Sequence, residues 1–339
     1  MQNSENRTPP DSEVESLFNL YNAGDFIGAE KFCSNLLKTY PDSALVSNML
    51  GVVFMAQDKP TQALAAYENT VKKNPDYPDV YNNLGILLNS LGQFDEAIDK
   101  FAKAVQLDPD FGDALNNLGA MLQNLNQHEQ ALTHLSRAVT LNPHSPLAYF
   151  NYANSLKATD RKDAALENYD RAITLHPSFS LAFNNRGNLL ESMARYEESS
   201  RSFTRAIELD PGYARAYSSR GSVEEKLGNY SRARRDFSRA VDLDPWRPEN
   251  PKQDSNFKFR LYINLGDIQM YFKEFDKALA IYDRAAEIEP NNLDVAGFRG
   301  NALAALGNLS EGLQLRQESF GFVSFDISNG VSIIHGRVK

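Results

Sequence analysis

Residues 78–111 read PDVYNNLGILLNSLGQFDEAIDKFAKAVQLDPDF, and this stretch of 34 residues decides the fold. Apolar side chains recur at helical spacing from Tyr81 to Leu91, before Gly92 breaks the run. A second apolar face from Phe94 to Val105 ends at Pro109, because proline cannot donate the i→i−4 hydrogen bond and disfavours helical backbone at the residue before it. The stretch therefore predicts two helices joined by a tight turn.

The same unit is copied along the chain. Its closing proline recurs every 34 residues, at positions 41, 75, 109, 143, 177, 211 and 245, and Pro290 follows after 45, as if 11 residues had been inserted once. Counted back from the proline, most units carry glycine 24 places earlier, alanine 12 places earlier, a large residue 8 places earlier and alanine 5 places earlier. Small residues at two facing places let paired helices approach closely, and the large residue fills the groove between them.

Glycine, alanine, aromatic residue, alanine and proline at these offsets resemble the tetratricopeptide repeat. The resemblance implies an all-α, right-handed solenoid in which the first helix of each pair lines a concave groove. We expect the chain to be divided into a disordered tail (1–9), seven repeats (10–247), an inserted loop (248–258), an eighth repeat (259–292), a degraded capping repeat (293–318) and a C-terminal hairpin or tail (319–339).

Beyond Glu318 the apolar period changes from helical to two. FGFVSFDIS and VSIIHGR flank Asn329-Gly330, a pair typical of a two-residue hairpin turn. Because an isolated β-hairpin is marginally stable, we expect it to cap the last helices, to pair with another copy through its edge, or to begin a further domain. The sequence leaves these three open.

Composition limits the class of protein. Apolar residues make up 42% of the chain, but no apolar run approaches the roughly 18 residues of a membrane span. The start MQNSENRTPP lacks the basic and apolar regions of a secretory signal, and the lone Cys33 fits a reducing compartment, so we expect a cytoplasmic protein. A net charge of −9 argues against nucleic-acid binding.

The charge is unevenly spread. Residues 1–179 carry 13 basic and 22 acidic side chains, whereas residues 180–260 carry 15 and 12. Four arginines lie close together on one expected second helix: Arg232, Arg234, Arg235 and Arg239. Two interpretations remain, a solvated outer face with interleaved acidic residues or a patch for an acidic partner.

No residue pattern predicts catalysis. The five histidines have no metal-ligand spacing, and no glycine is followed by lysine, so a phosphate-binding loop is excluded. We therefore expect a protein that is not an enzyme and that binds neither a cofactor nor a metal.

Asparagine recurs two residues before the glycine place, at Asn83, Asn117, Asn151, Asn185 and Asn264. Asparagine is a poor residue within a helix, because its amide competes for backbone groups. The amides either bond to the next repeat and set the pitch of the solenoid, or bind the backbone of an extended peptide. The second interpretation resembles the asparagine ladder in the superhelical tetratricopeptide domain of the O-linked N-acetylglucosamine transferase.

A second family pattern is the clamp that binds the C-terminal carboxylate of heat-shock chaperones. Asn154, Asn185 and Arg215 match three of its places, but Phe150 and Ser219 stand where basic residues belong. The candidate partner-binding residues are Asn83, Asn117, Asn151, Asn154, Asn185, Asn188, Arg215, Arg260 and Asn264.

The function expected from these residues is that of a scaffold or adaptor, which binds an extended segment of a partner protein in the groove. One alternative is a targeting or regulatory arm of a transferase-type enzyme whose catalytic part is on another polypeptide. Another is a structural protein that self-associates through the C-terminal hairpin.

Overall fold

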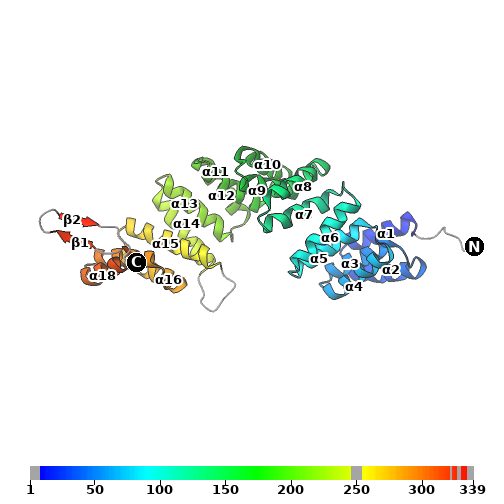
Figure 1. The fold of residues 1–339 in the computed structure, drawn as a ribbon, viewed down its shortest axis with the longest axis horizontal. Helices are drawn as coiled ribbons and strands as arrows, with labels where there is room; N and C mark the ends of the chain where they lie inside the picture. Colours follow the sequence, from blue (N-terminus) through cyan, green and yellow to red (C-terminus); the bar gives the residue numbers. More distant parts are fainter. Residues whose placement is uncertain (1–7, 246–253, 321–322, 327–329, 334–339) are drawn as a thin grey trace, which may run out of the picture. The chain divides into compact units, whose positions relative to one another are not determined.

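A computed structural model describes residues 8–245, 254–320, 323–326 and 330–333. The chain divides into two compact units, Met1–His176 and Pro177–Lys339. Helices dominate both units, and each helix packs mainly against its neighbours in sequence (Figure 1). The predicted all-α solenoid of paired helices is thereby confirmed.

Residues 8–176, the described part of the N-terminal unit, form five helix pairs. They are α1 (Asp11–Asn22) with α2 (Phe26–Thr39), α3 (Ala44–Ala56) with α4 (Pro60–Lys73), α5 (Pro78–Ser90) with α6 (Phe94–Leu107), α7 (Gly112–Asn124) with α8 (His128–Leu141), and α9 (Pro146–Ala158) with α10 (Lys162–Leu175). The first helices of successive pairs also contact one another from α3 to α9. Side chains on these first helices are therefore close enough to interact between repeats.

The described residues of the C-terminal unit continue the pattern with four pairs. They are α11 (Ser180–Ser192) with α12 (Tyr196–Leu209), α13 (Ala214–Lys226) with α14 (Tyr230–Leu243), α15 (Ser255–Tyr271) with α16 (Phe275–Ile288), and α17 (Leu293–Ala305) with α18 (Leu309–Phe320). First helices α11 and α13 contact each other as well.

Five of the described pairs close around a glycine and a ring, as the repeat predicts. In the third pair, a Cβ built on Gly85 would lie 2.7 Å from Cε1 of Phe101, so the ring packs directly on the backbone of α5. Phe101 is 2% exposed, and Ala97 and Ala104 beside it are fully buried. Close backbone approach and ring burial together hold the two helices, since burial of apolar area is the main favourable term in folding.

The last pair closes in a different way, which explains its degraded sequence. A Cβ built on Gly300 would lie 2.7 Å from the carbonyl oxygen of Gly312, and a Cβ on Gly312 would lie equally close to the oxygen of Gly300. Here two backbones touch at the place where five other repeats insert a ring. The absence of the alanine and the ring from their usual places in α18 is therefore compatible with a tightly packed hairpin.

The insert before the eighth repeat is shorter than expected. The predicted loop runs to Lys258, but α15 already begins at Ser255, where Asp254 caps it by accepting a hydrogen bond from the backbone N–H of Phe257 at 2.9 Å. Lys258 is 1% exposed, forms an ion pair with Asp244 and donates to the carbonyl oxygen of Pro245 at 3.2 Å. Residues 255–258 are helical because the cap and this buried ammonium fix the first turn; residues 248–253 lie outside the described part.

Two predicted segments fall largely on residues that the structure does not describe. The expected N-terminal tail overlaps residues 1–7, and the Asn329 turn position lies within 327–329. Strands β1 (Val323–Asp326) and β2 (Gly330–Ile333) pair antiparallel, with Val323 opposite Ile333. The hairpin around Asn329-Gly330, and its role in self-association, stay predictions.

Candidate functional site

A series of hydrogen bonds joins the first helices of the N-terminal unit. In each bond the Nδ2 of one asparagine donates to the Oδ1 of an asparagine 35 residues earlier, in the preceding repeat. The three bonds are Asn83 to Asn48 (3.1 Å), Asn117 to Asn82 (2.9 Å) and Asn151 to Asn116 (3.0 Å). The series therefore supplies bonds between repeats, as the first of the two sequence interpretations expects.

These bonds use only part of each amide. Asn83 and Asn117 are half-buried, and within the described residues nothing donates a hydrogen bond to the Oδ1 of either. An amide oxygen has two lone pairs, so each retains an acceptor on the surface of the first helices. Their role towards a partner stays a prediction, as does the resemblance to the transferase ladder.

The acceptors Asn48, Asn82 and Asn116 were not among the candidate residues. They stand one place before the donors in the repeat, and all three are buried. The signal was present in the sequence as the pairs Asn82-Asn83 and Asn116-Asn117. Asparagine at two adjacent places of the repeat predicts hydrogen bonds between successive repeats. The later place supplies the donor, and the earlier place of the preceding repeat supplies the acceptor.

The C-terminal unit brings four candidate residues together. Asn188 of α11, Arg215 of α13, and Arg260 and Asn264 of α15 line one open cavity of about 420 Å³. Three first helices contribute to it, with Ser218, Ser219 and Ser222 between the larger side chains. The cavity is thus a polar groove rich in hydrogen-bond donors and acceptors.

The two arginines of this cavity differ in their partners. Arg215 forms an ion pair of 2.6 Å with Asp254 and lies 4.7 Å from the ring centroid of Phe257. Arg260 is exposed and has no ion pair within the described residues. The guanidinium of Arg260 is therefore available to an acidic group, whereas that of Arg215 is already held by a carboxylate.

Asp254 has a lowered pKa. The backbone N–H of Phe257 contributes most to this shift, and the side chain of Arg215 adds to it, since both stabilise the ionised carboxylate. The carboxylate thus performs two tasks, capping α15 and holding Arg215 at the wall of the cavity.

The remaining candidates have other surroundings. Asn154, in the N-terminal unit, accepts a hydrogen bond of 2.6 Å from the hydroxyl of Tyr169 in its own repeat. Asn185, in the C-terminal unit, accepts one of 3.3 Å from Asn184. Asn264 donates to Ser222 at 3.5 Å, the long limit for such a bond. Asn188, Arg215, Arg260 and Asn264 are thus the candidate residues that line one cavity together in the described part of the chain.

Within the described residues, no three His, Cys, Asp or Glu side chains are grouped so that they could hold a metal ion. In the same part of the chain, every helix is too short or too polar to cross a membrane. The cytoplasmic location stays a prediction.

Comparison with known proteins identifies the repeat. Models described as tetratricopeptide repeat match residues 48–110, 112–145, 147–179, 184–248 and 259–292. None of the curated proteins compared with the chain matches it.

Solved structures resemble the chain in fold. They include the APC/C hetero-tetramer Cut9–Hcn1 (TM-score 0.60, 17% identity, 86% of this chain and 55% of that one), pilF of Pseudomonas aeruginosa (0.57, 19%, 66% and 97%) and a tetratricopeptide repeat protein from Parabacteroides merdae (0.52, 18%, 77% and 98%). Identities this low bear on the fold alone. Because the repeat models together cover more than half of its length, the chain belongs to the tetratricopeptide repeat family.

Proposed function

We propose that this protein is a non-catalytic scaffold which holds an extended segment of a partner protein against the first helices of its repeats. The observation that carries the proposal is the convergence of Asn188, Arg215, Arg260 and Asn264 on one cavity of the C-terminal unit. Three helices contribute these side chains, so a bound segment would cross successive repeats.

The chemistry of the cavity suits a polypeptide with an acidic side chain. Amides at Asn188 and Asn264 offer both a donor and an acceptor, which matches the alternating N–H and C=O groups of an extended backbone. Arg260 offers a guanidinium without an ion pair in the described part of the chain, and a carboxylate would form charge-assisted hydrogen bonds with it.

The N-terminal unit would extend the same mode of binding. The free lone pairs of Asn83 and Asn117 lie on first helices, as do the residues of the C-terminal cavity. An N–H of the segment could reach each oxygen without breaking the bonds between repeats, since the amide donates through Nδ2 and accepts through Oδ1.

Selection of peptides from a displayed random library, with the full chain as bait, tests the proposal. Affinities of the selected peptides are then measured for the wild type and for the double variant Arg260→Ala/Asn264→Ala. We expect a loss of about tenfold or more, since charge-assisted bonds are lost. Arg205→Ala, an exposed arginine of a second helix, is the matched control and should bind as the wild type does. Selected peptides that bind the double variant equally well would refute the proposal.

A further inference from the structure

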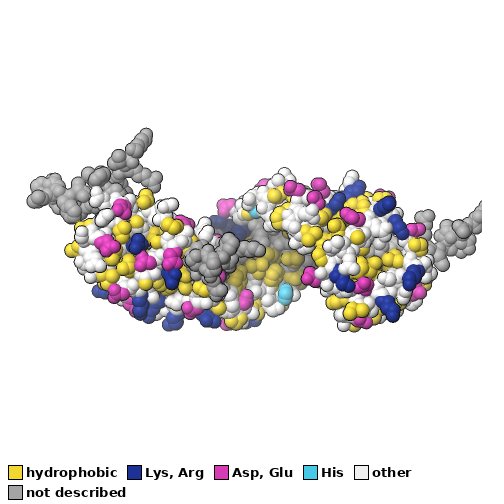
Figure 2. Space-filling view, turned by 90° about the horizontal axis from the view of Figure 1, so that it is seen from below, with side chains coloured by type: hydrophobic (Ala, Val, Ile, Leu, Met, Phe, Trp, Pro, Cys, Tyr) yellow, Lys and Arg dark blue, Asp and Glu magenta, His cyan; other side chains and the backbone are white. Residues whose placement is uncertain are grey.

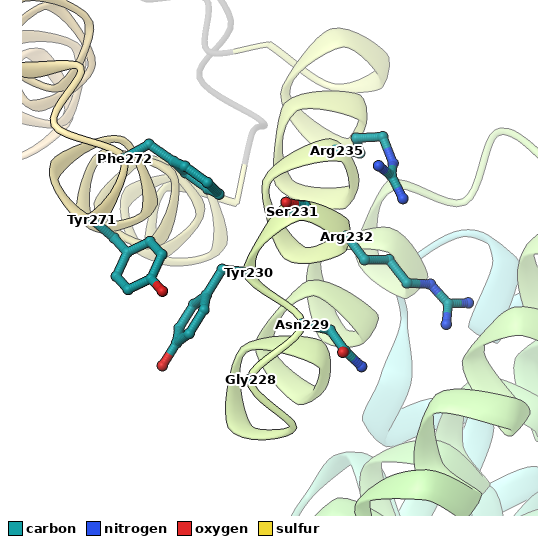
Figure 3. A pocket seen from close by; sticks show the side chains of 8 residues that line it. All are labelled: Gly228, Asn229, Tyr230, Ser231, Arg232, Arg235, Tyr271 and Phe272. Carbon is teal, nitrogen blue, oxygen red and sulfur yellow. The ribbon is translucent and has the colours of Figure 1, made fainter.

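A second candidate site lies on α14 and on neighbouring residues of α15 and α16, and we call it the α14 surface. It comprises the residues that line two cavities, among them Tyr230, Arg234, Arg235, Arg239, Gln269 and Tyr271. Two open cavities of about 590 and 420 Å³ adjoin there and share Arg235. Figure 3 shows Arg235 extending outward from α14, while the rings of Tyr230 and Tyr271 face each other beside the start of this helix. In Figure 2, Lys and Arg side chains gather along one margin of the C-terminal unit, at the left of the view.

The four arginines of the α14 surface differ in their partners. Arg232 pairs with Glu224 and Arg234 with Glu274, each at 2.9 Å. Arg235 and Arg239, by contrast, are exposed and have no ion pair within the described residues. The cavity they share is therefore locally positive despite the net negative charge of the whole chain.

Arg239 differs from the arginines at the same place in the neighbouring repeats, both of which form ion pairs. The same place holds Arg205 in the preceding repeat and Arg284 in the following one. Each of these pairs with a glutamate three residues on, at 2.8 and 2.9 Å respectively. At Arg239 the residue three places on is Asp242, whose side chain is one methylene shorter. Arg239 is thus left open to an external anion where its counterparts are neutralised.

The wall of the smaller cavity contains an incompletely bonded amide. Gln269 is 8% exposed, and its Oε1 is buried with no hydrogen-bond partner in the described part of the chain. A buried polar atom without a partner is costly, and rotation of the terminal amide would turn either its oxygen or its nitrogen to the cavity. A ligand that carries both N–H and C=O groups would satisfy it.

Stacked aromatic rings line the larger cavity. The rings of Tyr230 and Tyr271 stack with centroids 4.0 Å apart, and Tyr271 is 57% exposed. Arg234 lies 4.4 Å from the ring centroid of Phe272 and so covers the neighbouring ring. An apolar side chain of a ligand could pack on the exposed ring of Tyr271.

We propose that the α14 surface binds an extended acidic segment of a partner protein, at a site independent of the proposed groove. Arg235 and Arg239 are four residues apart on a helix, so their Cβ atoms are about 5–6 Å apart. Side chains two residues apart in an extended segment are roughly 6.5 Å apart, so two carboxylates in an acidic-x-acidic pattern match the two guanidinium groups. The backbone of the segment supplies the amide partner of Gln269.

Nucleic acid fits this surface less well. Asp242 and Glu274 lie in the same lining and would repel a continuous row of phosphates. Phosphates also bring no donor for Gln269. A peptide places its carboxylates selectively and has N–H groups between them.

Fluorescence anisotropy on the full chain tests the site. The probe is a labelled peptide with the pattern Glu-x-Glu-x-Glu followed by Tyr, compared with the same peptide bearing Gln for Glu and with a labelled oligouridine. We expect the acidic peptide alone to bind, and Arg235→Glu/Arg239→Glu to weaken it about tenfold or more. The matched control is Arg201→Glu/Arg205→Glu, which reverses exposed charges at the same two places of α12.

Each outcome decides the inference. Loss of binding in Arg235→Glu/Arg239→Glu, with Arg201→Glu/Arg205→Glu binding as the wild type does and with unchanged helical circular dichroism, supports it. Equal loss in both arginine variants would show nonspecific charge attraction and would overturn it. Tighter binding of the oligouridine, or no binding of the acidic peptide to the wild type, would overturn it as well.

Discussion

The Nδ2 of Asn151 donates to the Oδ1 of Asn116 over 3.0 Å, and the two side chains are 8% and 7% exposed. The bond joins α9 to α7, the first helices of adjacent repeats. Its partners are 35 residues apart in a chain with a period of 34, so each repeat can supply a donor at one place and an acceptor at the place before it. A buried amide pair of this kind fixes how one repeat lies on the next.

Asn116→Ala removes the acceptor and leaves the Nδ2 of Asn151 buried without it. We expect the variant to lose about 1–3 kcal/mol of unfolding free energy, the usual cost of an unsatisfied buried polar group. Urea denaturation followed by circular dichroism measures the loss. Hydrogen exchange should locate it in α7 and α9, since each repeat contacts mainly its neighbours.

Asn188→Ala is the control for this prediction. Asn188 is half-buried at the open cavity and forms no hydrogen bond within the described residues, so its loss should change stability by less than about 0.5 kcal/mol. Similar destabilisation by both variants would mean that the cost comes from lost packing and not from the amide pair.

The sequence predicted the repeats closely because one physical period governs them. First helices begin at residues 44, 78, 112, 146, 180 and 214, with the same interval of 34 residues that separates the prolines. Glycine, ring and proline recur together: the glycine allows close helix approach, the ring fills the groove and the proline ends the second helix. Their spacing therefore predicts where each helix begins and ends. The eighth unit departs from its expected start, since its first turn depends on Asp254 and Lys258, which have no counterpart in the repeat.

The site was less predictable because its contacts do not follow the period. Arg215 was singled out from the repeat, but its partner Asp254 lies 39 residues away and belongs to the insert. Arg235 was recognised as part of an arginine cluster, yet its sequence does not distinguish it from Arg234, which pairs with Glu274 of the next repeat. Pairing between repeats depends on side-chain direction around each helix, which spacing alone does not give.

Gly300→Ala should destabilise the last repeat. The added Cβ would meet the carbonyl oxygen of Gly312 at 2.7 Å, and a backbone atom cannot move aside as a side chain can. We expect a loss of about 1–3 kcal/mol, measured as faster hydrogen exchange in α17 and α18.

Gly187→Ala gives the matched comparison. Its added Cβ would meet the ring of Phe203 at 2.7 Å, and the fifth repeat already accommodates Ala153 at this place beside Tyr169. The ring can therefore shift, and the smaller loss should fall in α11 and α12. A larger effect of Gly187→Ala than of Gly300→Ala would contradict the role assigned to backbone contact.

Arg220 and Asp236 form a bidentate pair within the seventh repeat. Arg220 donates through Nε and Nη2 to the two carboxylate oxygens at 2.7 Å, and Asp236 is 4% exposed. Asp236→Ala should cost about 3–5 kcal/mol, because it leaves a largely buried guanidinium without its counter-charge.

Arg220→Leu/Asp236→Ser should recover most of that loss, since leucine occupies the place of Arg220 at Leu84 and Leu118, and serine occupies that of Asp236 at Ser202. Thermal unfolding of the two variants against the wild type tests this. If the double variant is as unstable as Asp236→Ala, the pair is needed for the fold itself and not only for neutralising its own charges.

Asp254 should make the wall of the groove sensitive to acid. Its folded pKa is lowered, so its stabilising contribution is complete above the ordinary aspartate value of about 3.9 and is lost as pH falls through the lower folded value. Protonation should loosen the first turn of α15 and release Arg215. The amide resonance of Phe257, which donates to this carboxylate, reports the transition in an NMR titration.

Asp254→Asn keeps a side chain able to cap the helix but abolishes the charge, so the pH transition should disappear. Acidic peptides selected on the groove should bind this variant more tightly, because Arg215 is free. A midpoint at or above the ordinary aspartate value, or unchanged peptide affinity in Asp254→Asn, would show that the carboxylate does not compete with a partner for Arg215.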